Sequence, residues 1–174
     1  MRVSSEAEWG DYQADLDQDY AHKMFAGRTN QEMVPHFRRN VIACTGALRW
    51  MPQTPFRYYM LGFRDFVMAE FEHLGASDAA SCFLGLVLEK LEEQPSHILP
   101  IMPELLPALR HVAQNQAVFG AAKSIYGNFR DKLAQIESLC HGSSDTDYRD
   151  IAPNGLGART ALQEPKTNRQ TIRD

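Results

Sequence analysis

Cysteine is scarce in this chain of 174 residues, and its three cysteines, Cys44, Cys82 and Cys140, lie far apart. The odd count and the lack of any CxxC pair argue against a disulfide scaffold and against a cysteine-based zinc site. Cys44 and Cys140 fall on apolar faces of expected helices. We therefore interpret the three cysteines as small buried side chains of a protein from a reducing compartment.

Long apolar runs are missing as well. The longest uninterrupted stretches fall far short of the roughly 20 residues that a membrane-spanning helix needs. The first residues, with Arg2, Glu6 and Glu8, contain no apolar core of a secretory signal. These absences lead us to expect a cytoplasmic protein that does not contact a membrane.

The local signatures of several enzyme classes are absent too. The chain contains no GxxxxGK[ST], GxGxxG, GxSxG or HExxH segment. These are the local signatures of P-loop nucleotide-binding proteins, dinucleotide-binding folds, α/β-hydrolases and zinc peptidases. A non-catalytic protein without a cofactor is therefore favoured over an enzyme.

Helical periodicity is the main pattern that the sequence does contain. Apolar residues recur every three or four positions in six segments, and no segment shows the alternation of a strand. The first expected helix ends near residue 25. The other five cover about 29–50, 54–74, 77–94, 104–119 and 124–140. The predicted fold class is all-α, a compact bundle of about six helices in 1–142. A flexible, disordered tail is predicted at 143–174, where turn-forming residues dominate.

Three local patterns describe the first three expected helices: one helix start and two apolar faces. Thr29 and Glu32 form a capping-box pattern at the start of the second helix. The third helix has the widest apolar arc and is the expected central helix. The predicted apolar stripe of the first helix is Trp9, Tyr12, Leu16, Tyr20 and Met24, and the arc of the third includes Phe56, Tyr59, Met60, Phe63 and Val67.

Arginines are concentrated in one segment, 28–64, which contains no lysine and has a net charge of +5. We call this segment the arginine island. Its guanidinium groups can grip carboxylates or phosphates through paired hydrogen bonds. Three interpretations stay open: ion pairs with acids of the first and fourth expected helices, contact with an anionic macromolecule, or a small anionic ligand. The candidate binding residues are Arg38, Arg39, Arg49, Arg57 and Arg64.

Acidic residues dominate 1–27, whose net charge is −4. The aspartates of the first helix, with Asp15 and Asp19 as candidate binding residues, would form either a solvated helix face or a docking surface for a basic protein. Complementary charge speeds such an association and contributes to its specificity.

Glu70 and His73 are the remaining candidates. Glu70 falls inside the apolar arc of the third helix, where a carboxylate must be paired or protonated, so it is a candidate general base. Glu70 and His73 also share the acid-x-x-histidine spacing of helical metal sites, as do Asp19 and His22. The two further inward glutamates that such a site requires are not evident, so we expect no metal.

These observations together favour a non-catalytic cytoplasmic protein-binding module, such as an adaptor or an immunity-type protein. Its partner would be another protein that contacts the acidic or the arginine-rich face. One alternative is a regulator that binds nucleic acid through the arginine island, although a sequence pI near 5.9 argues against general nucleic-acid binding. The other alternative is a small enzyme with Glu70 as its general base.

Overall fold

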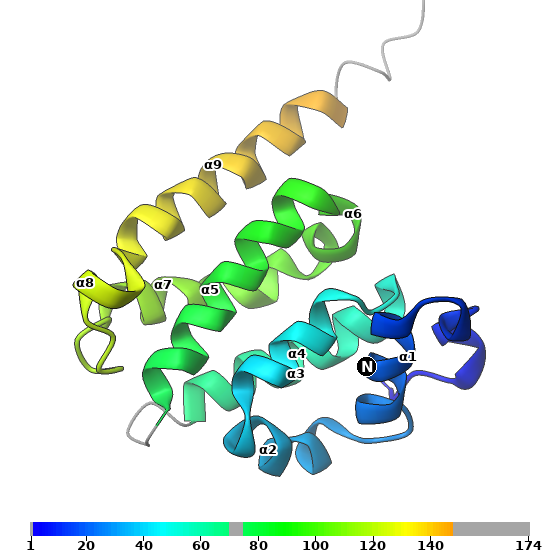
Figure 1. The fold of residues 1–174 in the computed structure, drawn as a ribbon. Coiled ribbons are helices and arrows are strands. Elements are labelled where there is room, and N and C mark those ends of the chain that lie inside the picture. Colours follow the sequence, from blue (N-terminus) through cyan, green and yellow to red (C-terminus); the bar gives the residue numbers. More distant parts are fainter. Residues whose placement is uncertain (1, 70–74, 148–174) are drawn as a thin grey trace, which may run out of the picture.

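The computed structural model describes the backbone of 2–69 and 75–147 and the side chains of 2–69 and 75–141. All regular elements of these residues are helical, so the predicted all-α class is confirmed (Figure 1). The α-helices are α1 (Leu16–Phe25), α2 (Asn30–Arg39), α3 (Val41–Arg49), α4 (Gln53–Ala69), α5 (Ala76–Glu93), α6 (Pro95–Ile98), α7 (Met102–Gln114), α8 (Lys123–Tyr126) and α9 (Phe129–Asp147). Three 3-10 helices are η1 (Glu6–Trp9), η2 (Tyr12–Ala14) and η3 (Leu99–Ile101).

The second expected helix is in fact two helices. The Thr29–Glu32 capping box starts α2 as predicted, with the Thr29 backbone N–H donating to Glu32 Oε2 over 2.8 Å. Asn40 then leaves the helical conformation, and its side chain accepts a hydrogen bond from the Ala43 backbone N–H over 2.9 Å. Asn40 therefore ends α2 and caps α3 at one position, because its side-chain oxygen satisfies a backbone donor of the new first turn.

The predicted stripe of the first helix is wrong at Leu16 and Tyr20, although Trp9, Tyr12 and Met24 do pack on the core. The helix begins only at Leu16, because Asp15 caps it and Gly10 interrupts the chain before it with a φ of +63°. Leu16 is 87% exposed and Tyr20 is 48% exposed. The buried side chains of α1 are Ala21 and Phe25 instead.

Helix α4 is the centre of the bundle, as predicted. It contacts α2, α3, α5, α6 and α7 and also η1. The part of its predicted arc that the structure describes is buried, with Phe56, Tyr59, Met60 and Phe63 fully enclosed. Stacked and edge-on rings join Phe63 to Phe37 of α2 and to Phe83 of α5, so aromatic packing ties three helices together.

The last helix, α9, lies along α5 and α7 at one edge of the molecule (Figure 1). Its backbone continues through Gly142 to Asp147, so the helix end predicted near Cys140 is too early. The helical hydrogen bonding of the backbone passes Gly142 without a break, although glycine usually weakens a helix. The rest of the predicted tail, from 148, lies outside the described residues.

Helices α2 and α4 are in tight contact at Gly62. A Cβ atom at this position would lie 2.2 Å from Asn30 Cγ and 2.7 Å from Asn30 Cβ. The Asn30 side chain is held there because its Nδ2 donates to the Tyr58 carbonyl oxygen over 3.1 Å. Gly62 is therefore required for the observed spacing of these two helices.

We expect Gly62→Ala to destabilise the protein by about 1–3 kcal/mol, because Asn30 must move and lose its bond to Tyr58. Gly46→Ala is the matched control, since a Cβ on Gly46 of α3 would meet nothing within 4 Å. That control should stabilise the protein by up to about 1 kcal/mol through helix propensity alone. Urea unfolding of both variants measures the difference, and equal free energies of unfolding would contradict the argument.

Candidate functional site

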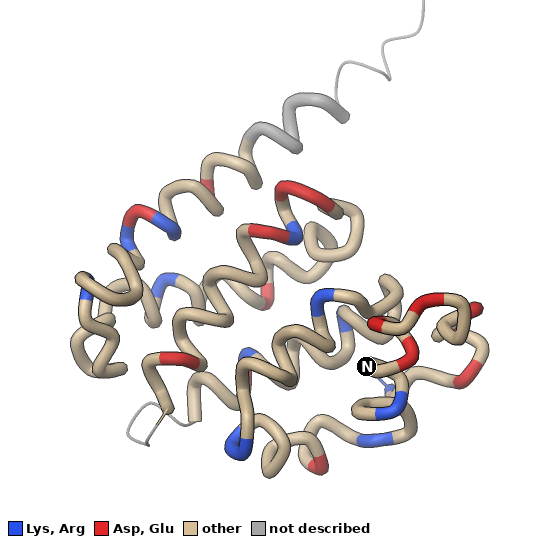
Figure 2. Tube along the Cα trace, in the orientation of Figure 1, with Lys and Arg blue, Asp and Glu red and all other residues tan. Residues whose placement is uncertain are grey.

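Acidic residues are concentrated along the backbone at the N-terminal end of the bundle (Figure 2). We call the segment formed by η1, η2 and α1, from Glu6 to Phe25, the N-terminal lobe. It contains six acids and one lysine. In Figure 2 this end of the molecule shows mostly red positions, whereas blue positions are more frequent along α2–α4.

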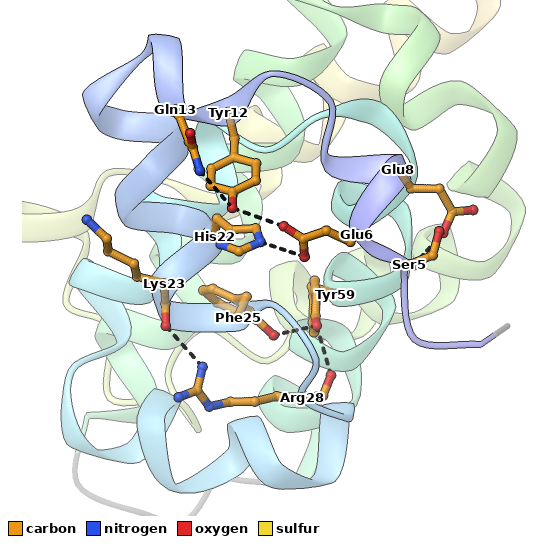
Figure 3. A network of polar contacts seen from close by, with 10 residues as sticks. All are labelled: Ser5, Glu6, Glu8, Tyr12, Gln13, His22, Lys23, Phe25, Arg28 and Tyr59. Carbon is orange, nitrogen blue, oxygen red and sulfur yellow. Dashed lines mark hydrogen bonds and ion pairs between the residues drawn. The ribbon is translucent and has the colours of Figure 1, made fainter.

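A polar network holds the 3-10 segments of the N-terminal lobe against α1 (Figure 3). Glu6 of η1 lies 3.0 Å from His22 Nε2 and accepts a second hydrogen bond from the Tyr12 hydroxyl, also over 3.0 Å. The Tyr12 ring stacks on the His22 ring at 3.7 Å, and Trp9 meets the same imidazole edge-on. Hydrogen bonds from His22 and then Tyr12 hold the pKa of the Glu6 carboxyl below its usual value.

Tyr59 fixes the same, C-terminal end of α1 from the side of the central helix. Its buried hydroxyl lies 2.6 Å from the Phe25 carbonyl oxygen and 2.8 Å from the Arg28 carbonyl oxygen (Figure 3). Burial raises the pKa of Tyr59 to about 12, so the phenol keeps its proton. Arg28 adds hydrogen bonds from Nη1 to the carbonyl oxygens of Lys23 and Met24, which end α1.

The outer face of α1 has an apolar centre. Leu16 and Tyr20 are four residues apart and share this face, with Asp17 on one side and Asp19 on the other. Asp19 pairs with Lys23. Asp15 serves as the cap of α1, with Oδ1 accepting from two backbone N–H groups. No basic side chain of the described residues pairs with Asp15 or Asp17.

Most of the arginine island is bonded to the protein itself. Arg57 donates to the carbonyl oxygens of Ser96 and His97 over 2.6 and 3.0 Å, which ties α4 to α6. Arg64 donates to the Glu104 carbonyl over 3.3 Å and pairs with its neighbour Asp65. These partners are mainly backbone oxygens, not the acids of the first helix that one interpretation required.

Arg49 is the member of the island that pairs with an acid of the fourth expected helix. Its Nε lies 2.5 Å from Glu89 Oε1, across the α3–α5 contact. The Arg49 carbonyl oxygen accepts from Lys90 Nζ over 2.6 Å. Lys90 is only 3% exposed, and burial lowers its pKa. Sequence reasoning missed this buried lysine because its neighbours Glu89, Glu92 and Glu93 suggested a solvated face.

Arg38 and Arg39 lie at a groove where the α2–α3 corner meets the start of α5. The groove has a volume of about 500 Å³, and its walls include Phe37, Phe66 and the exposed Ile42. Arg39 forms no hydrogen bond or ion pair with the residues described. The structure thus brings Arg38 and Arg39 to one groove and places Arg49, Arg57 and Arg64 at separate helix contacts.

The candidates Glu70 and His73 lie outside the described residues, so neither the general-base nor the metal hypothesis is tested. Among 2–69 and 75–141, no group of three or more histidine, cysteine, aspartate or glutamate side chains is arranged to hold a metal ion. No described helix is both long and apolar enough to cross a membrane.

Comparison with known proteins adds no relative: no protein-family model matches the chain, and neither the curated proteins nor the solved structures gave a match.

We expect Arg57→Gln to destabilise the protein by about 1–2 kcal/mol, because the His97 carbonyl loses its charged donor. The loss is limited because Gln53 also donates to the Ser96 carbonyl, over 2.8 Å. Arg39→Gln is the matched control and should change the free energy of unfolding by less than about 0.5 kcal/mol. Chemical denaturation of both variants tests whether the island is structural at Arg57, and equal effects would contradict that assignment.

The Glu6 network predicts a pH-dependent contribution to stability. Since the folded-state pKa of Glu6 lies below the ordinary glutamate value of 4.5, ionised Glu6 stabilises the fold above that pH. The contribution is lost as the pH falls through the folded-state pKa. The difference in free energy of unfolding between the wild type and Glu6→Gln should therefore shrink from about pH 5 to about pH 3. Parallel curves in urea unfolding at these pH values would disprove the linkage.

Proposed function

We propose that this protein is a non-catalytic, cytoplasmic protein-binding module, and that the outer face of α1 is its docking surface for a basic partner protein. The observation that carries the proposal is the exposure of Leu16 and Tyr20, 87% and 48%, between the acidic side chains of the N-terminal lobe. An apolar or aromatic centre with a charged rim is the usual composition of a specific protein interface.

Charge determines which kind of partner suits this face. Asp11 and Asp17 are exposed and have no basic partner in the described part of the chain. A partner that brings lysine or arginine to these carboxylates would be attracted at long range and would dock faster at low salt. An adaptor or an immunity-type inhibitor fits this chemistry.

Rigidity supports the same proposal. The Glu6–Tyr12–His22 network and the Tyr59 hydroxyl both fix the C-terminal part of α1, and the Asp15 side chain caps its start. A preorganised surface loses less conformational entropy on association than a mobile one. Nucleic-acid binding through the arginine island has less support, because Arg28, Arg49, Arg57 and Arg64 already donate to the protein's own oxygens.

Site-specific photo-crosslinking tests the proposal in the cells that produce the protein. A photoreactive phenylalanine analogue in place of Tyr20 should give one predominant cross-linked protein with a high lysine and arginine content. The same analogue in place of Val118, which is 58% exposed on the segment before α8, is the matched control and should not capture that protein.

The captured protein then allows a quantitative test. Leu16→Ala with Tyr20→Ala should weaken its binding at least about tenfold, because truncating central apolar contacts typically has that effect. Asp17→Lys should slow association and reduce its salt dependence. Equal capture at positions 20 and 118, or nucleic acid as the cross-linked species at position 20, would refute this function.

A further inference from the structure

The end of the molecule that lies away from the N-terminal lobe has the opposite charge. Residues 105–130, from α7 to the start of α9, contain no aspartate or glutamate, and Arg110, Lys123 and Arg130 give them a net charge of +3. Helices α8 and α1 lie on opposite sides of the molecule (Figure 1). The charge of the protein is therefore segregated between two ends.

Lys123 and Arg130 are the two cations of this end that have no acidic partner. Arg110 pairs with Glu137 of α9 over 2.8 Å. Lys123 and Arg130 are exposed and form no ion pair with the described residues. They belong to α8 and α9, yet both line one hollow of about 280 Å³, and no acidic residue lines it. Two uncompensated positive charges therefore meet at one hollow.

Exposed apolar side chains accompany these cations. Val118 is 58% exposed, and Ile125 of α8 is 76% exposed. Single exposed apolar residues are common on protein surfaces, so the charges beside them decide what they can bind. The α1 face has an apolar centre with unpaired carboxylates, whereas this end has apolar side chains with unpaired cations. We call the surface formed by the following residues the α8 surface: Val118, Lys123, Ile125 and Arg130.

Hydrogen bonds hold the α8 surface in place. Gln116, which is 7% exposed, donates from Nε2 to the Gly127 carbonyl oxygen over 2.7 Å, and its Oε1 accepts from the Phe129 backbone N–H over 3.0 Å. The Tyr126 hydroxyl donates to Asp78 Oδ1 over 2.8 Å and so ties α8 to α5. A surface that is ordered in advance loses less conformational entropy on association.

We propose that the α8 surface docks the α1 face of a second copy of this chain. The exposed carboxylates of one copy then face Lys123 and Arg130 of the next, and the apolar parts of the two faces meet. This contact joins two different surfaces, so each dimer keeps one unused α1 face and one unused α8 surface and can add further copies. The inference rests on the α1 docking surface of the proposed function but needs no basic partner protein.

A second cationic corner, at Arg39 and Ile42, suits the α1 face less well. Ile42 is 63% exposed, but Asp78 lines the groove beside it and Glu32 lies in the first turn of the same helix as Arg39. Acids near this corner repel the carboxylates of α1, whereas none lines the hollow at the α8 surface.

The contact is expected to be weak. Its ion pairs are exposed, and its apolar parts are small, which is typical of transient association. The net charge of −4 opposes it little, because charges farther apart than about 8 Å are largely screened at physiological ionic strength. A basic partner protein that binds α1 more tightly displaces the second copy.

Sedimentation velocity of the purified full-length protein, with a reducing agent present, tests the proposal. The dilute protein should sediment as a monomer of 19.7 kDa. Between about 10 μM and about 1 mM, the range of weak association, the average mass should rise at low salt and pass the dimer mass. The rise should shrink in about 0.5 M sodium chloride, because salt screens the ion pairs.

Three double variants identify the two surfaces. Lys123→Glu with Ile125→Ala impairs the α8 surface, and Asp17→Lys with Leu16→Ala impairs the α1 face. Each should weaken self-association at least about tenfold, because a central apolar contact and a charge pair are lost together. Arg39→Glu with Ile42→Ala is the matched control at the other cationic corner and should associate like the wild type.

An equimolar mixture of the two impaired variants gives the decisive result. Each variant keeps the surface that the other lacks, so the mixture should form a 1:1 dimer that does not grow, with about the affinity of the wild-type contact.

Four results would overturn the proposal: a wild type that stays monomeric throughout, a wild-type mass that stops at the dimer, a control variant that is impaired like the other two, or a mixture that stays monomeric. The wild-type measurement decides alone if a variant fails to fold. A monomeric wild type leaves the proposed function standing, because cross-linking from position 20 tests for a different protein at α1.

Discussion

The buried hydroxyl of Tyr59 is the contact on which the arrangement of the N-terminal half depends. It projects from the central helix α4 and meets the carbonyl oxygens of Phe25 and Arg28, on both sides of the turn between α1 and α2. Burial raises the pKa of the phenol to about 12, so its hydroxyl can donate to these carbonyl oxygens even in alkaline solution. This contact sets the direction in which α1 leaves the bundle, and hence the surface that α1 presents.

The position of α1 explains why its acids are not neutralised by the arginine island. Arg28 is directed at the end of α1, and Arg57 and Arg64 are directed at carbonyl oxygens of the segments that pack on α4. A guanidinium bonded to several backbone oxygens satisfies acceptors that would otherwise be left at helix ends. These arginines thus stabilise the junctions between helices, and the negative charge of the N-terminal lobe stays exposed to solvent.

The sequence predicted those parts of the fold whose partners lie within a few residues. The Thr29–Glu32 box and the arc of α4 are such features, because a helix repeats its geometry every turn. The stripe of the first helix was wrong at Leu16 and Tyr20, because an apolar spacing continued through residues that do not form one helix. Gly10 interrupts the chain, and the α-helix starts only after Asp15. The arginine partners were missed for another reason: backbone carbonyl oxygens are present at every residue, so no sequence pattern marks the ones that lie near Arg57.

Helix η1 connects α1 to the central helix α4. Glu6, at one end of this single turn, holds His22 and Tyr12 and so positions the 3-10 segments against α1. Glu8, two residues later, accepts from the Ser5 backbone N–H and pairs with Arg2. Trp9 ends the turn fully buried against Tyr59 and His22. Because η1 contacts both helices, it fastens the last turn of α1 to the core, and a surface that is ordered in advance loses less conformational entropy when a partner binds.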